Sequence, residues 1–152
     1  MNTIYFDMDG TIANLYAVEN WLEKLRVENP SPYKDAEPMV EVEEFQILLA
    51  ILQNRGVRIG IVSWLAKDSS KSYDKLVRNA KKDWLREMFP EIQFDEMHFV
   101  KYGTRKDYIV KDKFGIIFDD DERVRDNWRG LPINPNTQDI LEKLREIKKM
   151  TE

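Results

Sequence analysis

Two carboxylates close the first apolar segment of the chain. Residues 4–6 lead into Asp7, and Asp9 follows two positions later, before Gly10 and Thr11. Such β-branched and aromatic runs are typical of buried strands, where ionised carboxylates are costly unless positive charge meets them. Side chains two positions apart on a strand share one side, so Asp7 and Asp9 can face one metal and phosphate site. A simple Asp-Gly turn is the alternative interpretation.

A second apolar segment with the same ending appears later in the chain. Residues 115–118 are followed by Asp119, Asp120 and Asp121. Mg²⁺ takes oxygen ligands and is usually held by one or two carboxylates together with phosphate and water. Two separate strands that end in carboxylates therefore favour a divalent metal site over the turn interpretation.

These residues resemble the motifs of the haloacid dehalogenase (HAD) superfamily of phosphotransferases. The first motif of that family, hydrophobic residues before Asp-x-Asp-Gly-Thr, is similar to residues 6–11. The second, a Ser or Thr that ends a hydrophobic strand, is similar to residues 58–62 followed by Ser63. The fourth, a pair of acids after a strand, is similar to Asp119 and Asp120. The resemblance spans nearly the whole chain and is specific for the superfamily, not for a substrate.

The third motif of the family is a Lys between the second and fourth motifs. We choose Lys106, because Gly103 provides a turn that could place it at the start of a helix, where a phosphate is already attracted. Lys101 directly follows a predicted strand, and Lys111 lies more than a turn further along the predicted helix. Both remain alternatives for the phosphate-binding Lys.

The resemblance implies a Mg²⁺-dependent phosphomonoester hydrolase that works through an aspartyl phosphate. Asp7 would be the nucleophile, and Asp9 would protonate the leaving oxygen and then activate water. Asp9 would also offer its backbone carbonyl to the metal, and Asp120 would act through water or by orienting its neighbour. The implied metal ligands are Asp7, Asp9, Asp119 and Asp120. The implied substrate-binding residues are Thr11, Ser63, Trp64 and Lys106.

Strands that alternate with helices predict a Rossmann-like α/β fold, a parallel sheet flanked by helices. The longest helix is expected over 69–89, ending before Pro90, and Gly56 is expected to end an earlier helix. Such sheets bind ligands beyond the carboxyl ends of their strands, where every candidate residue falls. The strands are expected at 3–7, 57–62, 96–100, 115–119 and 131–133.

Residues 13–42 are expected to form a short cap insertion, with a helix around 15–27 and a Pro-broken loop at 28–33. A small cap would leave the site open to large substrates, or close over a compact nucleoside monophosphate. Trp64 is the aromatic residue we favour for stacking a base, because it follows Ser63 in the expected strand-end loop. The remaining candidates, which more typically pack cap against core, are Tyr16, Trp21 and Tyr33.

Composition predicts a single domain over residues 1–152, with 42% hydrophobic residues for one core. The net charge of −4 gives no global basic field toward nucleic acid or membrane. The absence of cysteine excludes disulfides and fits a reducing compartment. No apolar stretch could span a bilayer, and the chain begins with a core strand, so a cytoplasmic protein without a membrane partner is expected.

The small 5′-nucleotidase-like branch is the most similar, because there too a strand ending in Asp-Asp is followed by a helix that reaches a Trp. Asp119, Asp120 and Trp128 keep that relation. A small phosphorylated substrate, such as a nucleotide, is therefore the expected partner. The alternatives are a module that processes phosphate ends of nucleic acid, which is less favoured, and a non-catalytic phosphate-binding domain. The sequence does not determine the oligomeric state.

Several other residues are assigned structural roles. His98 lies inside a predicted strand without a Cys or His at ligand spacing. Lys81 and Lys82, like the basic segment 143–149, are expected on solvated helix faces. Trp128 is expected to pack the helix after the acidic cluster onto the sheet.

Overall fold

The computed structural model describes residues 3–152 and contains a sheet of five strands, all parallel, in the order β3-β2-β1-β4-β5. The predicted Rossmann-like α/β sheet is thereby confirmed, and each strand lies within two residues of its expected bounds. The strands are β1 (Thr3–Phe6), β2 (Arg58–Trp64), β3 (Glu96–Val100), β4 (Ile116–Phe118) and β5 (Leu131–Ile133).

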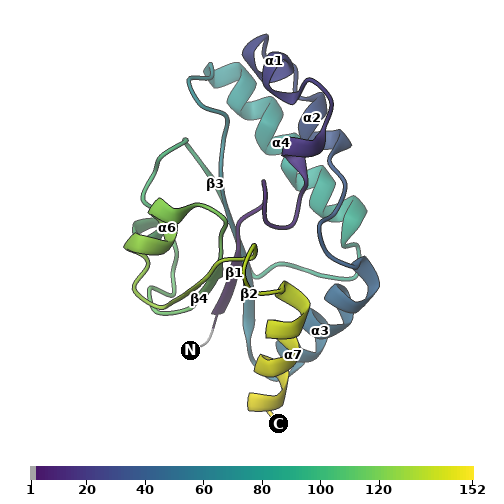
Figure 1. The fold of residues 1–152 in the computed structure, drawn as a ribbon, viewed down its shortest axis with the longest axis vertical. Helices are drawn as coiled ribbons and strands as arrows, with labels where there is room; N and C mark the ends of the chain where they lie inside the picture. Colours follow the sequence, from purple (N-terminus) through teal and green to yellow (C-terminus); the bar gives the residue numbers. More distant parts are fainter. Residues whose placement is uncertain (1–2) are drawn as a thin grey trace.

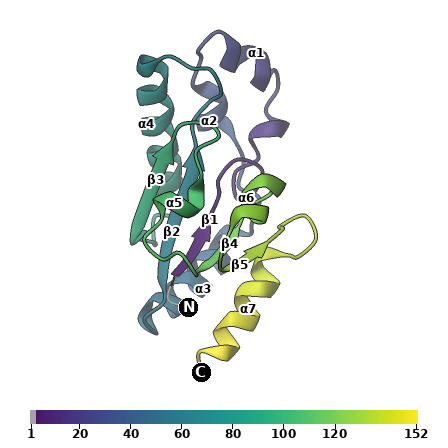
Figure 2. The same cartoon turned by 90° about the vertical axis from the view of Figure 1, so that its left-hand side faces the viewer.

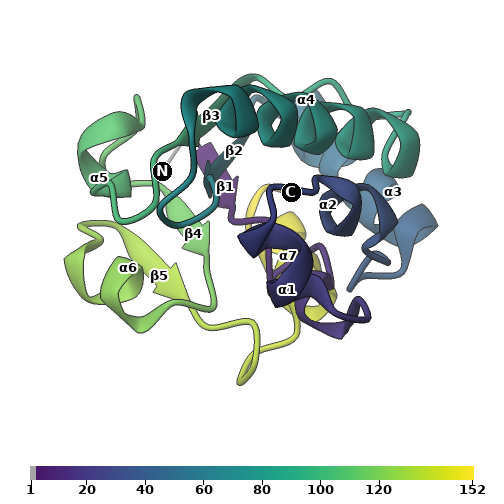
Figure 3. The ribbon, with the colours of Figure 1, turned by 90° about the horizontal axis from the view of Figure 1, so that it is seen from above.

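Helices cover both faces of the sheet because parallel strands need crossover connections. Along β1, Ile4 and Phe6 face the larger core together with α3, α4 and α7, whereas Tyr5 faces a smaller core beside α5 and α6. Figure 3 shows α5 and α6 on the opposite side of the sheet from α3, α4 and α7, and Figure 1 shows the same for α6. These helices are α3 (Val42–Asn54), α4 (Lys71–Met88), α5 (Lys106–Ile109), α6 (Glu122–Asn127) and α7 (Ile140–Met150).

Local signals set the ends of the long helices as predicted. Ser70 begins α4 by accepting a hydrogen bond from the Tyr73 amide, and α4 ends at Met88, two residues before Pro90. Gly56, just past α3, has a φ of 88°, which a residue with a side chain rarely adopts. The apolar periodicity of α4 therefore lies between a serine cap and a proline stop.

The cap segment, residues 13–42, differs from its predicted structure. The helix expected over 15–27 is divided into a 3₁₀ turn η1 (Leu15–Ala17) and α1 (Trp21–Arg26), because Asn20 between them adopts left-handed backbone with a φ of 57°. The loop expected at 28–33 instead begins a helix, α2 (Ser31–Asp35). Pro30 is the N-cap of this helix and Pro32 lies in its first turn, where a helix needs no backbone N–H donor.

The cap segment is fastened along α4. The Tyr73 hydroxyl donates to the Asn29 carbonyl at 2.8 Å, and the Trp84 indole donates to the Ala36 carbonyl at 2.8 Å. Ser70 adds a backbone hydrogen bond to the Glu28 carboxylate. Figure 2 shows α1 and α2 beyond the end of the sheet toward which the strands point. The segment therefore forms a wall beyond that edge.

A buried polar network fixes the loop between α5 and β4. The Tyr5 hydroxyl donates to Glu96 at 3.1 Å and accepts from the Asp112 amide at 2.9 Å. Glu96 also accepts from the Lys111 amide at 3.0 Å and contacts His98 Nε2 at 2.7 Å. His98 thus has the structural role expected of it, and the network anchors the segment that follows α5.

The predicted packing of Trp128 is confirmed. Its ring lies edge-on against Tyr5, with 5.7 Å between ring centroids, and its indole N–H donates to the Gly115 carbonyl at 2.9 Å.

Within residues 3–152, no helix has both the length and the apolar character needed to cross a membrane.

Candidate functional site

The candidate site lies at the point of the sheet where the crossover connections change direction. The chain runs from the central strand β1 to β2 on one side, while β4 pairs with β1 on the other. Asp7 follows β1 and Asp119 follows β4, and the Asp7 amide donates to the Phe118 carbonyl at 2.9 Å. Open α/β sheets bind ligands at such a switch point, beyond the carboxyl ends of the strands.

Three carboxylates converge at this edge. Asp7, Asp119 and Asp120 each offer an oxygen, and these oxygens lie within 4.8 Å of one another. Burial, followed by repulsion from Asp7, raises the pKa of both Asp119 and Asp120 above the ordinary aspartate value. Clustered carboxylate oxygens that repel one another are a donor set suited to a hard divalent cation such as Mg²⁺.

The Thr11 hydroxyl lies within hydrogen-bonding distance of two of the three acids. It lies 3.1 Å from Asp7 Oδ2 and 3.3 Å from Asp120 Oδ1, and it can donate to either oxygen. The side chain is buried and does not line the adjoining cavity. The structure therefore places Thr11 as a partner of the acids; a direct contact with substrate stays a prediction.

Gly10 allows the backbone to turn against the same acids. Its φ is 80°, and a Cβ at this position would come within 2.9 Å of both Asp120 Cγ and the Tyr16 ring. Both the backbone conformation and the space therefore require glycine here. The chain therefore makes a tight turn directly after Asp9.

Among the three candidate lysines, only the Lys106 side chain reaches the acids. Its ammonium lies 2.9 Å from Asp7 Oδ1 and 2.7 Å from Asp119 Oδ2, and the side chain is 2% exposed. Burial alone would lower its pKa, but attraction to Asp7 and Asp119 outweighs this and raises it above the ordinary lysine value. Lys106 begins α5 as predicted. Lys101 and Lys111 are exposed, and Lys111 lies beyond the end of α5 rather than on it.

Lys81 is a site residue that the sequence prediction missed. The solvated position expected for it is wrong, because its side chain is 1% exposed, whereas Lys82 is exposed as expected. Its ammonium donates to Asp9 Oδ2 at 2.8 Å, Ser63 Oγ at 2.7 Å and the Trp64 carbonyl at 2.7 Å. The available signal was helical spacing, since Lys81 lies on the buried face of α4.

Asp9 and Ser63 lie on the same side of the site as Lys81. The Asp9 side chain is 17% exposed and lines the cavity, and burial raises its pKa while Lys81 opposes that shift. Ser63, the last residue but one of β2, is fully buried and does not line the cavity. Phosphate binding by Ser63 therefore stays a prediction, and its hydroxyl accepts from Lys81.

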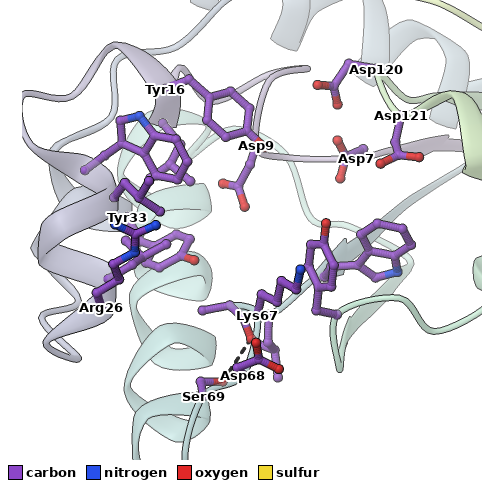
Figure 4. A pocket seen from close by; sticks show the side chains of 18 of the residues that line it. Asp7, Asp9, Tyr16, Arg26, Tyr33, Lys67, Asp68, Ser69, Asp120 and Asp121 are labelled. Carbon is purple, nitrogen blue, oxygen red and sulfur yellow. Dashed lines mark hydrogen bonds between the residues drawn. The ribbon is translucent and has the colours of Figure 1, made fainter.

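A cavity of about 570 Å³ opens beyond these acids. Figure 4 shows Asp7, Asp120 and Asp121 at one end of it, with Tyr16, Tyr33 and Arg26 on the side of the cap segment. The remaining wall includes Trp64, Tyr102 and Lys67. The cavity thus combines an acidic end with an aromatic body.

Some of the candidate aromatic residues pack against other side chains, and several also line the cavity. Tyr16 and Trp21 pack edge-on at 5.0 Å between ring centroids while both line the cavity. Trp64 is the last residue of β2 rather than part of the loop after it, and its indole donates to the Thr104 carbonyl at 2.8 Å. The Lys106 ammonium lies 5.2 Å from the Trp64 ring centroid. Trp64 therefore lines the cavity next to Lys106.

Comparison with protein-family models gives no match, and comparison with curated protein sequences gives none either. Among solved structures, the chain is similar to the HAD domain of the effector protein Lem4 from Legionella pneumophila, with a TM-score of 0.44 and 17% sequence identity. The match covers 96% of this chain and 93% of the other. A similarity at this score carries no functional assignment.

Proposed function

We propose that the protein is a Mg²⁺-dependent phosphomonoester hydrolase of the HAD type with Asp7 as its nucleophile. The observation that carries the proposal is the cluster of Asp7, Asp119 and Asp120 around Lys106 at the switch point of the sheet. Asp7 is more than a hundred residues from Asp119 and Asp120 in the chain, yet the three carboxylates face one site.

Bound Mg²⁺ would be held by Asp7, Asp119 and Asp120, and it would supply positive charge to the phosphate oxygens. An Asp7 oxygen then attacks phosphorus in line, and the bond from phosphorus to the leaving oxygen breaks. Asp9 gives its proton to that oxygen. In the second step Asp9 takes a proton from water, the water oxygen attacks phosphorus, and phosphate leaves Asp7 unmodified.

Lys106 would assist the nucleophile. Asp7 and a phosphate group are both negative, so they repel each other unless a cation lies between them. The Lys106 ammonium already contacts Asp7 and Asp119 and lies at the acidic end of the cavity. It is placed to neutralise charge that spreads over the phosphate oxygens in the transition state.

A small substrate fits the remainder of the site. A volume of about 570 Å³ is within the range of cavities that bind small molecules, roughly 300–1,000 Å³. Tyr16, Trp64 and Tyr102 offer ring faces or edges beyond the acids. A compact monoester with a planar ring, such as a nucleoside monophosphate, is the substrate class that these walls support.

The test is phosphate release from a panel of substrates in the presence of Mg²⁺. The panel contains nucleoside monophosphates, sugar phosphates, aryl phosphates, and oligonucleotides that carry a 3′- or 5′-phosphate. We expect turnover of small monoesters with a planar ring in preference to oligonucleotides. Preferred release from oligonucleotides would instead support nucleic-acid end processing. Phosphate release from none of them would contradict the proposed activity.

A further inference from the structure

We propose that Lys81 is a positioning residue that holds the Asp9 carboxylate in the orientation needed for proton transfer to the leaving oxygen. This inference rests on the proposed hydrolase function. It concerns a buried cation that the reaction steps above do not use. Its support comes from the contacts, the burial and the surroundings of the Lys81 side chain.

The Lys81 ammonium has three N–H donors, and each has an acceptor. The acceptors are Asp9 Oδ2 at 2.8 Å, Ser63 Oγ at 2.7 Å and the Trp64 carbonyl at 2.7 Å. The last two are parts of β2, a central strand of the sheet, so they fix the ammonium to a rigid element. Through Lys81, the Asp9 carboxylate is in turn tied to that strand.

The position of Lys81 argues against a role in folding alone. Its helical neighbours Val77 and Trp84 are core residues, and an apolar side chain at the same depth would continue that face of α4. Burial of an ammonium is costly, and replacing buried ion pairs by apolar residues is often neutral or stabilising. A lysine in this core position, aimed at Asp9, is therefore better explained by what it does to Asp9.

The same contacts argue against direct binding of substrate by Lys81. All three donors are already used, and the side chain does not line the cavity, whereas Asp9 does. Lys81 must therefore act through Asp9. Ser63 accepts its bond from Lys81, so the hydroxyl hydrogen of Ser63 is not consumed by this contact.

The cap segment contributes to the enclosure of the Lys81 ammonium. The Lys81 ammonium lies 5.1 Å from the centroid of the Tyr33 ring, which comes from α2 and is itself buried. Figure 4 shows the Asp9 carboxylate on the side of Tyr16 and Tyr33, apart from Asp7 and Asp120. Lys81 thus holds Asp9 away from the metal-binding acids and toward the body of the cavity, where a leaving group would lie.

The consequence is a specific dependence on the leaving group. A nitrophenolate leaves without a proton, so its release does not need Asp9. An alkoxide is a far poorer leaving group and needs a proton as the bond to phosphorus breaks. Misplacing Asp9 should therefore slow the release of an alcohol and spare the release of a nitrophenol, whereas general damage to the site should slow both equally.

The experiment measures single-turnover release of alcohol from two esters of similar size, para-nitrophenyl phosphate and para-nitrobenzyl phosphate, with full-length protein in excess and Mg²⁺ present. For Lys81→Met we expect the rate on the benzyl ester to fall by about 100-fold or more, as for loss of general acid catalysis, and the rate on the phenyl ester to change little. Asp9→Asn should show the same selectivity, and the double variant should be no slower than Asp9→Asn alone.

Lys82→Met is the matched control, because it makes the same change one residue along α4 at an exposed position. It should leave both rates unchanged. The ratio of the two rates does not depend on the folded fraction, so a partly unfolded Lys81→Met preparation still gives an answer. If that variant does not fold at all, Lys81→Gln, which is neutral but keeps N–H donors, should show the same direction of change with a smaller loss.

Equal losses on both esters, or no loss for Lys81→Met where Asp9→Asn is selective, would overturn the role assigned to Lys81. Hydrolysis of neither ester by the unmodified protein would contradict the proposed function instead. The two failures are therefore distinguishable.

Discussion

Replacing Lys106 by Met removes the only side-chain cation that contacts both Asp7 and Asp119 among residues 3–152. The methionine keeps the length and apolar body of the side chain, so the perturbation is mainly the loss of charge. Both carboxylates are almost fully buried and lose a partner at 2.9 Å and 2.7 Å respectively. We expect effects on both turnover and stability.

Loss of one preorganised charge at a transition state lowers kcat by about 100- to 1,000-fold. Loss of one partner of a buried ion pair costs about 3–5 kcal/mol, and a chain of this size loses roughly 2–4 °C of Tm per kcal/mol. The Tm of Lys106→Met without metal should therefore fall by roughly 6–20 °C. Added Mg²⁺ should restore part of this loss, because a bound cation again neutralises the two carboxylates.

The assays are phosphate release from an aryl phosphate with Mg²⁺ and thermal melts with and without Mg²⁺. Lys101→Met and Lys111→Met are matched controls at exposed positions and should retain nearly full turnover and Tm. A nearly normal Lys106→Met together with an inactive Lys101→Met would refute the reasoning. The phosphate-binding role would then move to Lys101.

Two further predictions concern the metal site. Mg²⁺ at 100 times its Kd should stabilise the folded protein by about 2.7 kcal/mol, or roughly 5–11 °C of Tm. Chelation should abolish turnover. If neither the Tm nor turnover responds to a chelator, the metal site is misread. Gly10→Ala should lower the Tm and the response to Mg²⁺, because its Cβ would meet the Asp120 carboxylate. Gly56→Ala has a similar positive φ with nothing within 4 Å, so it should lower the Tm but leave the Mg²⁺ response intact.

The acid cluster could be predicted because it depends on local rules. Asp7 follows β1 and Asp119 follows β4, and parallel strands bring their carboxyl ends to one edge of the sheet. The start of α5 at Lys106 was predictable from the turn at Gly103, whose φ is 85°. These features need only a parallel sheet and a turn residue, and short stretches of sequence indicate both.

Lys81 and the cap segment could not be predicted in the same way. A lysine is expected on a solvated face, and its burial here depends on Asp9, a partner 72 residues away in the chain. The division of the cap helix depends on the left-handed backbone of Asn20, which asparagine tolerates but does not require. The hydrogen bond from Lys81 to Ser63 was equally hidden, because it depends on the same burial of Lys81.

The most direct test of the proposed mechanism is to locate a phosphoryl group on the protein. Asp9→Asn should slow hydrolysis of the intermediate, so this variant is mixed with para-nitrophenyl phosphate and Mg²⁺, quenched in acid, and analysed by intact and peptide mass spectrometry. We predict the added mass of one phosphoryl group on Asp7, and none when Asp7→Asn is combined with Asp9→Asn. Turnover by the unmodified protein with no adduct in Asp9→Asn, or with the adduct on another residue, would contradict the assignment of Asp7 as nucleophile.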